Sequence, residues 1–549
     1  MAKFRRIEFW TVIKILIFMF VLVTILYPVS TVVIRSITDS NGNITLGNFT
    51  KFFTIPYYRN VLFNSLKVSF ITTALSVVIG VSLAYLLNRY EFKTKRFLNI
   101  AIILSLMSPP FIGAYAWIML FGRAGFITAF LERVFHINMP TIYGELGIIG
   151  VFTFKMYPYV YLFTSGALSG IDASLEEAAE SLGSSRLKRL MNITIPVVCP
   201  SILAGAVMVF MSCISDFGVP SLIGQNYKVL ATLVYEQYMS EIGTSSNFAS
   251  AVSMIIISMA ALLLILQKAY INKKNYQMSS LHPVSMLQLR SGVRFLVWLP
   301  MFAVVLFSLC PQIVVIATSF KNCNGPYFVE GWGMDNYVMI FTRMIRSIKN
   351  TYIFSLWAIV IMVAVGSLAA YLSVRRKSAL TGFIDLSLTF PYVIPGAVMG
   401  LCLISAFNRA PLFLVGTATI MVLSYSVRKI PYTVRSASGF LTQMDPGMEE
   451  ASVSLGIAPG KTFLKITLPL MLPGVISGAI LSWIETINEL SSSIMLYTGR
   501  TSTISVSIFN EVARNSFGTA AAMATILTIS TVIMLTVSTV ISKGKISIV

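Results

Sequence analysis

The chain has 549 residues, of which 56% are hydrophobic and 11% are charged, and its formal net charge is +20. So few charged residues exclude an ordinary soluble protein, and the apolar residues gather in runs of about 18–25, the length that an α-helix needs to cross a bilayer. The five cysteines have no CxxC spacing and therefore indicate neither a disulfide framework nor a metal cluster.

The first half of the chain predicts six membrane-spanning helices. These apolar runs must be helical, because lipid offers no hydrogen-bond partners to backbone polar groups. We place the six spans near residues 12–34, 60–87, 97–121, 144–168, 198–217 and 248–268.

A charged segment, residues 172–196, lies between the fourth and fifth spans, and we call it the first prong. Asp172 or Ser174 can cap a short helix, and Ser174 and Glu177 have the spacing of a capping box. Gly183 stands where a residue in the left-handed conformation ends a helix. A second helical stretch then runs to Pro196. The pattern predicts a helix, a sharp turn and another helix, exposed on one face of the membrane.

The second half of the chain repeats the first. Positions that recur 286 residues later include Asn64, Gly80, Ala84-Tyr85, Arg89 and Pro109, and positions that recur 273 residues later include Pro158-Tyr159, Asp172, Glu176-Glu177, Gly183 and Pro196. We therefore expect two homologous repeats, residues 1–270 and 293–549, joined by a polar cytoplasmic linker at 271–292. Six further spans are expected near residues 294–319, 350–373, 381–407, 411–434, 471–490 and 517–541.

The second prong is residues 445–469. In it Asp445 is the expected cap, and Pro446 is expected at the first helical position. Gly456 and Pro469 repeat the turn and the closing proline.

Six spans return each half to its starting side, so the repeats are expected to be parallel and related by a pseudo-twofold axis along the membrane normal, with a path between them. With both termini in the cytoplasm, every basic cluster lies on the cytoplasmic side, as membrane topology favours. The positive charge is then explained by topology rather than by nucleic-acid binding.

A single prong is readily explained as a connector at the membrane surface whose charges are solvated. Two prongs in register, with the same caps, favour a pair of docking elements for two matched cytoplasmic partners.

At this point the residues carry a family resemblance. Glu177-Ala178-Ala179, Gly183 and Ile193-Thr194-Ile195-Pro196 resemble the EAA signature of importer permeases of ATP-binding-cassette (ABC) transporters, and the second copy departs from it only at Ser452. The resemblance covers nearly the whole chain. It implies an all-α integral membrane protein of about twelve transmembrane helices in two parallel six-helix repeats, the type I ABC importer permease fold. It also implies that the prong residues couple to the ATPase: Asp172, Glu176, Glu177, Ala178, Ala179, Gly183, Pro196, Asp445, Glu449, Glu450, Ala451, Gly456 and Pro469.

The resemblance further implies partners and a location. The partners are two copies of a cytoplasmic ABC ATPase, an extracytoplasmic solute-binding protein and membrane lipid. ATP and Mg are carried by the ATPase. The location is a bacterial inner membrane, which the chain crosses many times with both termini in the cytoplasm. Gly460-Lys461-Thr462 looks like the end of a phosphate-binding loop, but that motif requires glycine where Leu455 stands. We therefore expect a transport subunit without its own nucleotide site, cofactor or catalytic residue.

Matched positions of the two halves are the candidates for lining the shared path. Lys155 and Arg428 lie inside apolar spans, where an ionisable side chain usually faces protein or water, with snorkelling to the surface as the alternative. Asp216 and Glu489 lie near the outer ends of the fifth and eleventh spans. Three alternative roles are open for them there: attracting a cation, lining an outer gate, or capping a loop. Prolines break the third and ninth spans, either freeing carbonyls for a cavity or kinking the helices; they are Pro109, Pro110, Pro391 and Pro395.

The cargo follows from resemblance alone. A double-length permease of this size resembles the permeases of ferric-iron, thiamine and 2-aminoethylphosphonate importers. Residues 108–125 look most like the ferric-iron type. Ferric iron is the expected cargo, with 2-aminoethylphosphonate, thiamine, polyamine and sulfate left open. No metal site is expected in the chain, because no Cys, His and carboxylate cluster has ligand spacing. An ion-coupled secondary transporter is the rival class, and it leaves the two prongs unexplained.

Overall fold

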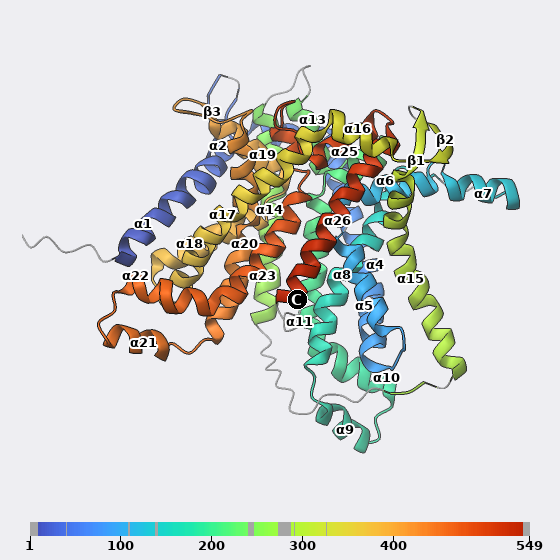
Figure 1. Cartoon of the computed structure of the whole chain (residues 1–549), viewed down its shortest axis with the longest axis horizontal. Coiled ribbons are helices and arrows are strands. Elements are labelled where there is room, and N and C mark those ends of the chain that lie inside the picture. The colour runs from blue at the N-terminus through green and yellow to red at the C-terminus, as the bar shows by residue number, and fades with distance from the viewer. Residues whose placement is uncertain are drawn as a thin grey trace, which may run out of the picture.

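The structure is a computed structural model, and it describes residues 9–39, 41–107, 110–123, 125–137, 141–239, 246–272, 287–289, 291–324 and 327–541. The described chain is a bundle of long helices with two small hairpins (Figure 1). Most of the predicted linker 271–292 lies outside the described residues, and so does Pro109.

The helices of the first half follow the predicted spans. They are α1 (Phe9–Val21) continued by η1 (Leu22–Leu26) and α2 (Tyr27–Ser36), α4 (Pro56–Arg89), α5 (Lys95–Met107) with α6 (Pro110–Phe121), α8 (Glu145–Ser169), α11 (Ile195–Ser215) and α14 (Ser246–Asn272). Short elements between them are α3 (Gly47–Thr54), α7 (Phe126–Phe135), α9 (Ala173–Ser181), α10 (Arg186–Arg189), η2 (Leu190–Thr194), α12 (Gly218–Ile223) and α13 (Leu230–Met239).

The second half is built in the same way. Its long helices are α15 (Ser291–Ser319), α17 (Ile345–Arg375), α18 (Ala379–Thr389) with η3 (Phe390–Tyr392) and α19 (Gly396–Phe407), α20 (Ala418–Gln443), α23 (Leu468–Ile487) and α26 (Phe517–Ile541). Its short elements are β1 (Lys321–Asn324), β2 (Tyr327–Trp332), α16 (Asp335–Arg343), β3 (Asn408–Arg409), β4 (Leu412–Phe413), α21 (Gly447–Ser454), α22 (Pro459–Thr462), η4 (Phe463–Thr467), α24 (Ser493–Leu496) and α25 (Ile504–Ala513).

Ten helices of the described chain are long and apolar enough to cross a membrane, or eleven if α18–η3 and α19, which meet at 116°, form one bent span. One of the ten, Gly113–Phe135, covers only the last part of the predicted third span, 97–121. The predicted span 411–434 corresponds to α20, which carries Arg428, Lys429 and Arg435 and is therefore less apolar. It is nevertheless packed between the apolar helices α17 and α23. It begins at Ala418 and not at 411, because residues 408–413 contain the β3–β4 hairpin.

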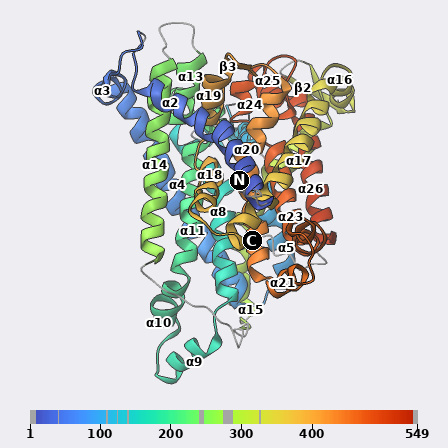
Figure 2. The ribbon, with the colours of Figure 1, turned by 90° about the vertical axis from the view of Figure 1, so that its left-hand side faces the viewer.

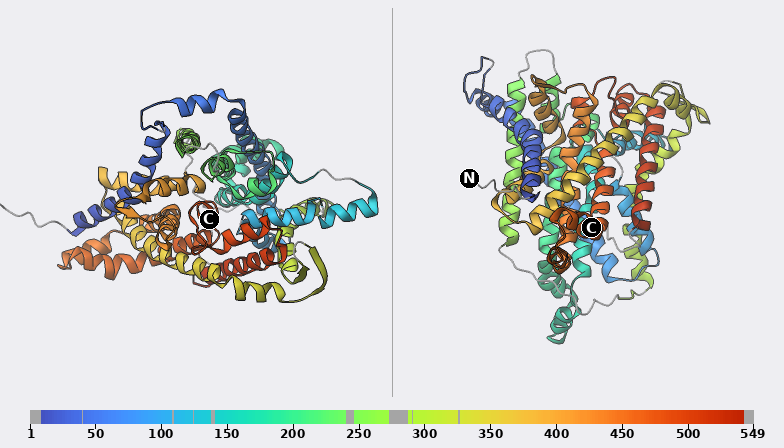
Figure 3. Two further views of the ribbon diagram at one scale, coloured as in Figure 1. Left: turned by 90° about the horizontal axis from the view of Figure 1, so that it is seen from above. Right: turned by 60° about the vertical axis from the view of Figure 1, so that its left-hand side comes forward.

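The two prongs project from the same end of the molecule. In Figure 1 and Figure 2, α9, α10 and α21 lie at the lower edge, and α13, α16 and α25 lie at the upper edge. Figure 3 shows α7 extending sideways beyond the bundle. We call these two edges the prong side and the far side.

The core of each half is a triplet of packed helices, α4–α8–α11 in the first and α17–α20–α23 in the second. Glycines allow the close approach. A Cβ at Gly80 would lie 2.8 Å from the Cβ of Val160, and one at Gly205 would lie 2.9 Å from the Cα of Val160, so α8 is held between two glycine faces. Gly366 and Gly478 occupy the matched positions against α20. Small residues at contacts are the usual device for packing helices in membranes.

The first span of each half packs on the other half. Trp10 of α1 stacks on Tyr371 of α17, with 4.4 Å between ring centroids. Reciprocally, Trp298 of α15 donates a hydrogen bond to Thr94 at 2.8 Å, and Ser308 of α15 is 3.0 Å from the hydroxyl of Tyr157 in α8. The two halves are therefore joined by exchanged helices as well as by their central faces.

Candidate functional site

The first prong is a short helix closed at both ends by the residues that the sequence indicated. The N–H of Ser174 donates to the side chain of Asp172 at 2.9 Å, so Asp172 is the cap of α9 and the capping-box spacing from Ser174 is not used. Gly183 has a φ of +77°, and the N–H of Ser184 bonds to the carbonyl of Ala179 at 3.0 Å. Arg189, which is buried, forms an ion pair with Glu180 at 2.5 Å and so joins the two helices of the prong.

The second prong has the same form with different details. The N–H of Gly447 donates to Asp445 at 2.9 Å, and Gly456 has a φ of +78°. Helix α21 begins at Gly447 and Pro446 is its cap residue, so the prediction that Pro446 is the first helical residue was wrong by one position. The side chain of Ser452 is 3.0 Å from that of Thr462, a contact that joins the two helices of this prong.

The sequence suggested that a proline ends the second helix of each prong, but in the structure the helix continues past it. Pro196 and Pro469 lie in the first turn of α11 and α23, and wider π turns, η2 and η4, precede them. A proline cannot donate to the preceding turn and its ring crowds the carbonyl there, and a π turn makes room for both defects. One helical rod therefore runs from Arg186 to Ser215, and another from Pro459 to Ile487.

Two acidic residues of the second prong face different ways. Glu449 accepts from the hydroxyl of Tyr371 at 3.0 Å and from Nε of Arg375 at 3.3 Å, so it fastens α21 to α17. Arg375 also donates to the carbonyl of Met444 at 2.7 Å. Glu450, in contrast, is exposed.

In the first prong, Glu177 and Ala178 are exposed and Ala179 is half-buried, and the side chain of Glu176 lies outside the described residues. Ala451 is exposed in the second prong.

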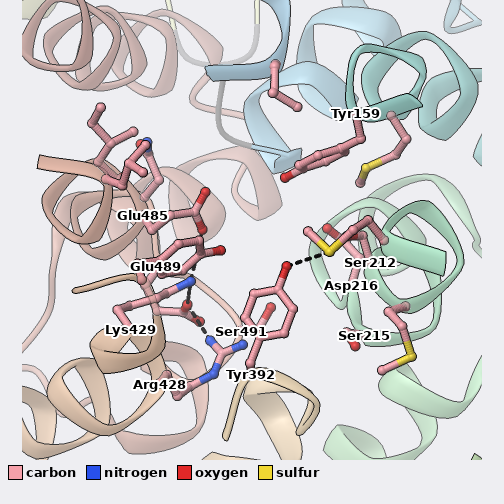
Figure 4. A pocket seen from close by; sticks show the side chains of 18 of the residues that line it. Tyr159, Ser212, Ser215, Asp216, Tyr392, Arg428, Lys429, Glu485, Glu489 and Ser491 are labelled. Atoms are coloured by element: carbon pink, nitrogen blue, oxygen red, sulfur yellow. Dashed lines mark hydrogen bonds and ion pairs between the residues drawn. The ribbon is translucent and has the colours of Figure 1, made fainter. Parts of the chain in front are cut away.

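A cavity of about 390 Å³ lies between the two halves (Figure 4). Eighteen of its 26 lining residues form pairs at an offset of 273 across the repeat, and these include Lys155 with Arg428, Met156 with Lys429, Tyr159 with Tyr432, Ser212 with Glu485, Ser215 with Asn488, and Asp216 with Glu489. The cavity therefore lies where a pseudo-twofold axis would place a shared path.

The charged side chains of the cavity neutralise each other. Arg428 forms an ion pair with Glu489. Lys429 bridges two carboxylates, with its Nζ 3.0 Å from Glu485 and 3.2 Å from Glu489. On the other wall, Lys155 interacts with the charge of Asp216. Three basic and three acidic side chains line the cavity, which fits the cost of an unpaired charge in a low-dielectric interior.

Asp216 and Glu489 serve two purposes. Each lines the cavity, and each also accepts a backbone N–H of the chain that follows, Val219 at 2.9 Å and Ser492 at 3.0 Å. As the sequence indicated, both lie at the ends of their spans, since Asp216 follows the last residue of α11 and Glu489 lies two residues beyond α23. The structure adds that Glu489 contacts Arg428, in the central part of α20.

The four prolines predicted to line the path differ in their position relative to the cavity. Pro391 lines the cavity from η3, Pro395 caps α19 at the bend, and Pro110 begins α6, while Pro109 lies outside the described residues. The bend brings Tyr392 into the cavity, where its hydroxyl lies 2.7 Å from the sulfur of Met208, across the boundary between the halves (Figure 4).

Sequence reasoning missed Lys429, Glu485 and Tyr392. It looked for chemistry repeated in both halves, and these positions are Met156, Ser212 and Leu106 in the first half. Their one sequence signal is that Lys429 and Glu485 are charges inside otherwise apolar helices. Among the described residues, no group of three or more His, Cys, Asp or Glu side chains is placed to hold a metal ion.

Comparison with known proteins shows where this architecture recurs. Residues 76–275 and 362–546 each match the family of binding-protein-dependent transport system inner membrane components. The ferric transport system permease protein FbpB of Actinobacillus pleuropneumoniae is 28% identical over 86% of this chain and 69% of its own length. A putative ferric transport system permease protein FbpB of Haemophilus influenzae is 28% identical over 89% of this chain and 77% of its own length. The molybdenum transport system permease protein ModB of Mycobacterium bovis is 28% identical over 40% of this chain and 81% of its own length.

Proposed function

Because the chain belongs to the family of binding-protein-dependent transport system inner membrane components, as a fused double-length permease of an ABC importer, we propose that it is the complete membrane path of a ferric-iron importer. The observation that carries the mechanism is the pair of continuous rods, each of which joins a prong to the wall of the central cavity. The second helix of the first prong ends beside Asp216, and that of the second prong ends two residues before Glu489.

The rods explain how a separate ATPase would drive transport. ATP binding on the partner draws two ATPase subunits together, and each subunit carries one prong with it. Because each prong continues as a cavity-lining helix, movement at the prong side becomes movement of the cavity wall. Glu449 holds the second prong to α17, so α17 follows the same motion. The halves then open the cavity alternately to either side, with no chemistry performed by this chain.

The same geometry supports a proposal on partner number and topology. Two prongs in one chain support one copy of this permease with two ATPase subunits, and an extracytoplasmic binding protein delivers cargo to the far side. The prong side is the cytoplasmic side of a bacterial inner membrane. The N-terminal end of α1 lies there, because a Cβ at Gly460 in α22 would be 3.0 Å from the ring of Phe9. ATP and Mg belong to the ATPase.

Support for ferric iron comes from the long relatives. Two permeases named for ferric transport align with most of this chain, whereas the molybdenum permease aligns with less than half of it. 2-Aminoethylphosphonate, thiamine, polyamine and sulfate are the competing cargoes.

The test uses the permease, its ATPase and its binding protein reconstituted in proteoliposomes. We expect ATP-dependent uptake of ferric iron delivered by the binding protein, and native mass spectrometry should find one permease with two ATPases. Uptake of a competing cargo without ferric uptake would replace the assigned substrate, and two permease copies would refute the one-chain path.

A further inference from the structure

The two walls of the cavity differ in one ion pair. The opposite charges of Lys155 and Asp216 in the first half match those of Arg428 and Glu489 in the second, of which the latter two form an ion pair. The second half adds Lys429 and Glu485, where the first half has Met156 and Ser212. Structural symmetry does not require this additional pair, because the first half packs its own triplet of helices without it.

The additional pair presents its negative end to the cavity. The side chain of Glu485 is 39% exposed, whereas those of Lys429, Arg428 and Glu489 are 10%, 13% and 5% exposed. Glu485 is therefore the most exposed of the four charged side chains on this wall, and its carboxylate is more open to a cargo than either cation is.

From the other half, Glu485 meets the hydroxyl of Tyr159 and also interacts with the charge of Lys155. In Figure 4 the hydroxyl of Tyr159 and the carboxylate of Glu485 point toward one another across the cavity. Tyr392 and Tyr432 line the same space, with 5.8 Å between their ring centroids. A carboxylate binds hard cations and repels an oxyanion, and hydroxyl oxygens can complete the ligand set of such a cation.

We propose that Glu485, backed by Lys429, is the specificity-determining contact of the cavity, and that it selects hard, oxygen-preferring cations by exchanging its ammonium partner for the cargo. The ferric identity of that cargo rests on the proposed function. Lys429 neutralises Glu485 when the cavity is empty, and its flexible side chain already reaches Glu489. When a cation binds Glu485, Lys429 keeps its contact with Glu489 and gives up only one of its two carboxylates. When the cation leaves, the ammonium returns, which favours release.

The direct test is binding of Tb³⁺, a hard trivalent cation whose luminescence is excited through nearby tyrosine rings. The permease–ATPase complex is titrated with Tb³⁺ as wild type, Glu485→Gln, Glu485→Asp and Lys429→Met. Removing one charged oxygen ligand should weaken Tb³⁺ binding about tenfold or more in Glu485→Gln. Glu485→Asp should restore most of the binding, and Lys429→Met should tighten it.

A matched control is Glu236→Gln. Glu236 pairs with Lys228 at 2.5 Å and is 37% exposed, close to the exposure of Glu485, but it lies in α13 on the far side. This variant should bind Tb³⁺ as wild type does. Copurification of the ATPase with each variant shows that the complex is assembled.

Uptake of ferric iron by the same variants separates the two proposals. Reduced uptake in Glu485→Gln, with rescue by Glu485→Asp, supports the cation contact. Tb³⁺ binding that depends on Glu485 in a complex that moves no ferric iron would refute the assigned cargo and keep the cation contact. Wild-type Tb³⁺ binding and wild-type ferric uptake in Glu485→Gln would overturn the cation contact and keep the cargo. Molybdate uptake that is lost in Lys429→Met and intact in Glu485→Gln would also overturn it, because the cavity would then bind an anion.

Discussion

The prongs and the cavity walls come from the same duplication, yet they have diverged to different extents. Both prongs keep an aspartate that binds the N-terminus of the short helix, a left-handed glycine, a π turn and a proline in a continuous rod. The walls keep one matched pair of charges, and the second wall adds Lys429 and Glu485. This difference is expected from the proposed function, in which each prong would bind its own copy of a similar partner while both walls would share one cargo that need not be symmetric.

The largest expected effect is on the feature that both prongs share most closely. Gly183→Val with Gly456→Val should abolish retention of the ATPase and reduce uptake to background, and each single variant should lie between the double variant and wild type. A β-branched residue in the left-handed region costs about 1–2 kcal/mol or more. An added Cβ meets nothing within 4 Å at either glycine, so the effect would come from the backbone alone. ATPase copurification, ATP turnover and uptake are measured together.

Gly439→Val is the control, because Gly439 is helical and its added Cβ also meets nothing within 4 Å. Wild-type values of all three quantities in the double variant would make the prongs simple connectors.

A second prediction sharpens the comparison of the two helix triplets. A Cβ at Gly80 would meet the backbone carbonyl oxygen of Tyr157 at 2.8 Å, whereas one at the matched Gly366 would meet the Cγ2 of Thr433 at 3.0 Å. A backbone atom cannot rotate away, so Gly80→Ala should destabilise the protein by about 1–3 kcal/mol. Gly366→Ala should change stability little, because alanine also favours the helix by about 1 kcal/mol. Thermal unfolding midpoints in detergent decide this, and equal shifts for the two variants would contradict it.

A third prediction separates the two glutamates of the second prong. Glu449→Gln weakens charge-assisted hydrogen bonds to Tyr371 and Arg375 and should loosen α21 by about 1 kcal/mol. Hydrogen exchange in residues 445–456 should then rise. Glu450→Gln should leave that exchange unchanged, because its side chain is exposed, and should lower ATPase retention instead. Equal exchange in both variants would show that Glu449 does not fasten the prong.

The features that could be predicted from the sequence are those that recur in both halves of the chain. Matching the halves identified both prongs and brought together Lys155, Arg428, Asp216 and Glu489, all of which line the cavity. The lengths of the apolar runs also located most of the spans, because lipid leaves few alternatives to a helix.

What the sequence did not predict depends on packing between distant segments. Pro196 and Pro469 indicate helix ends when only local chemistry is considered, but a π turn lets the chain continue as one rod. Glu485 has no matched charge in the first half, so its place in the cavity became visible only when α20 and α23 were set side by side. The fastening role of Glu449 likewise requires α17, which lies more than seventy residues earlier in the chain.

The smallest expected effect concerns the one departure from the shared signature, Ser452. In the first prong the matched residue is Ala179, and the two helices are joined instead by the ion pair of Arg189 with Glu180. In the second prong Thr462 stands where Arg189 would be, and its contact with Ser452 joins the helices. Ser452→Ala therefore restores the signature but removes a buried hydrogen bond, which should cost about 0.5–1.5 kcal/mol. We expect slightly faster hydrogen exchange in α21 and unchanged ATPase retention, because Ser452 is buried and does not face a partner. Ala179→Ser, which adds a hydroxyl at the matched position, is the reciprocal variant and should gain no stability, since Arg189 is already paired there. Loss of ATPase retention in Ser452→Ala would show that the serine contacts the partner and that the two prongs dock by different chemistry.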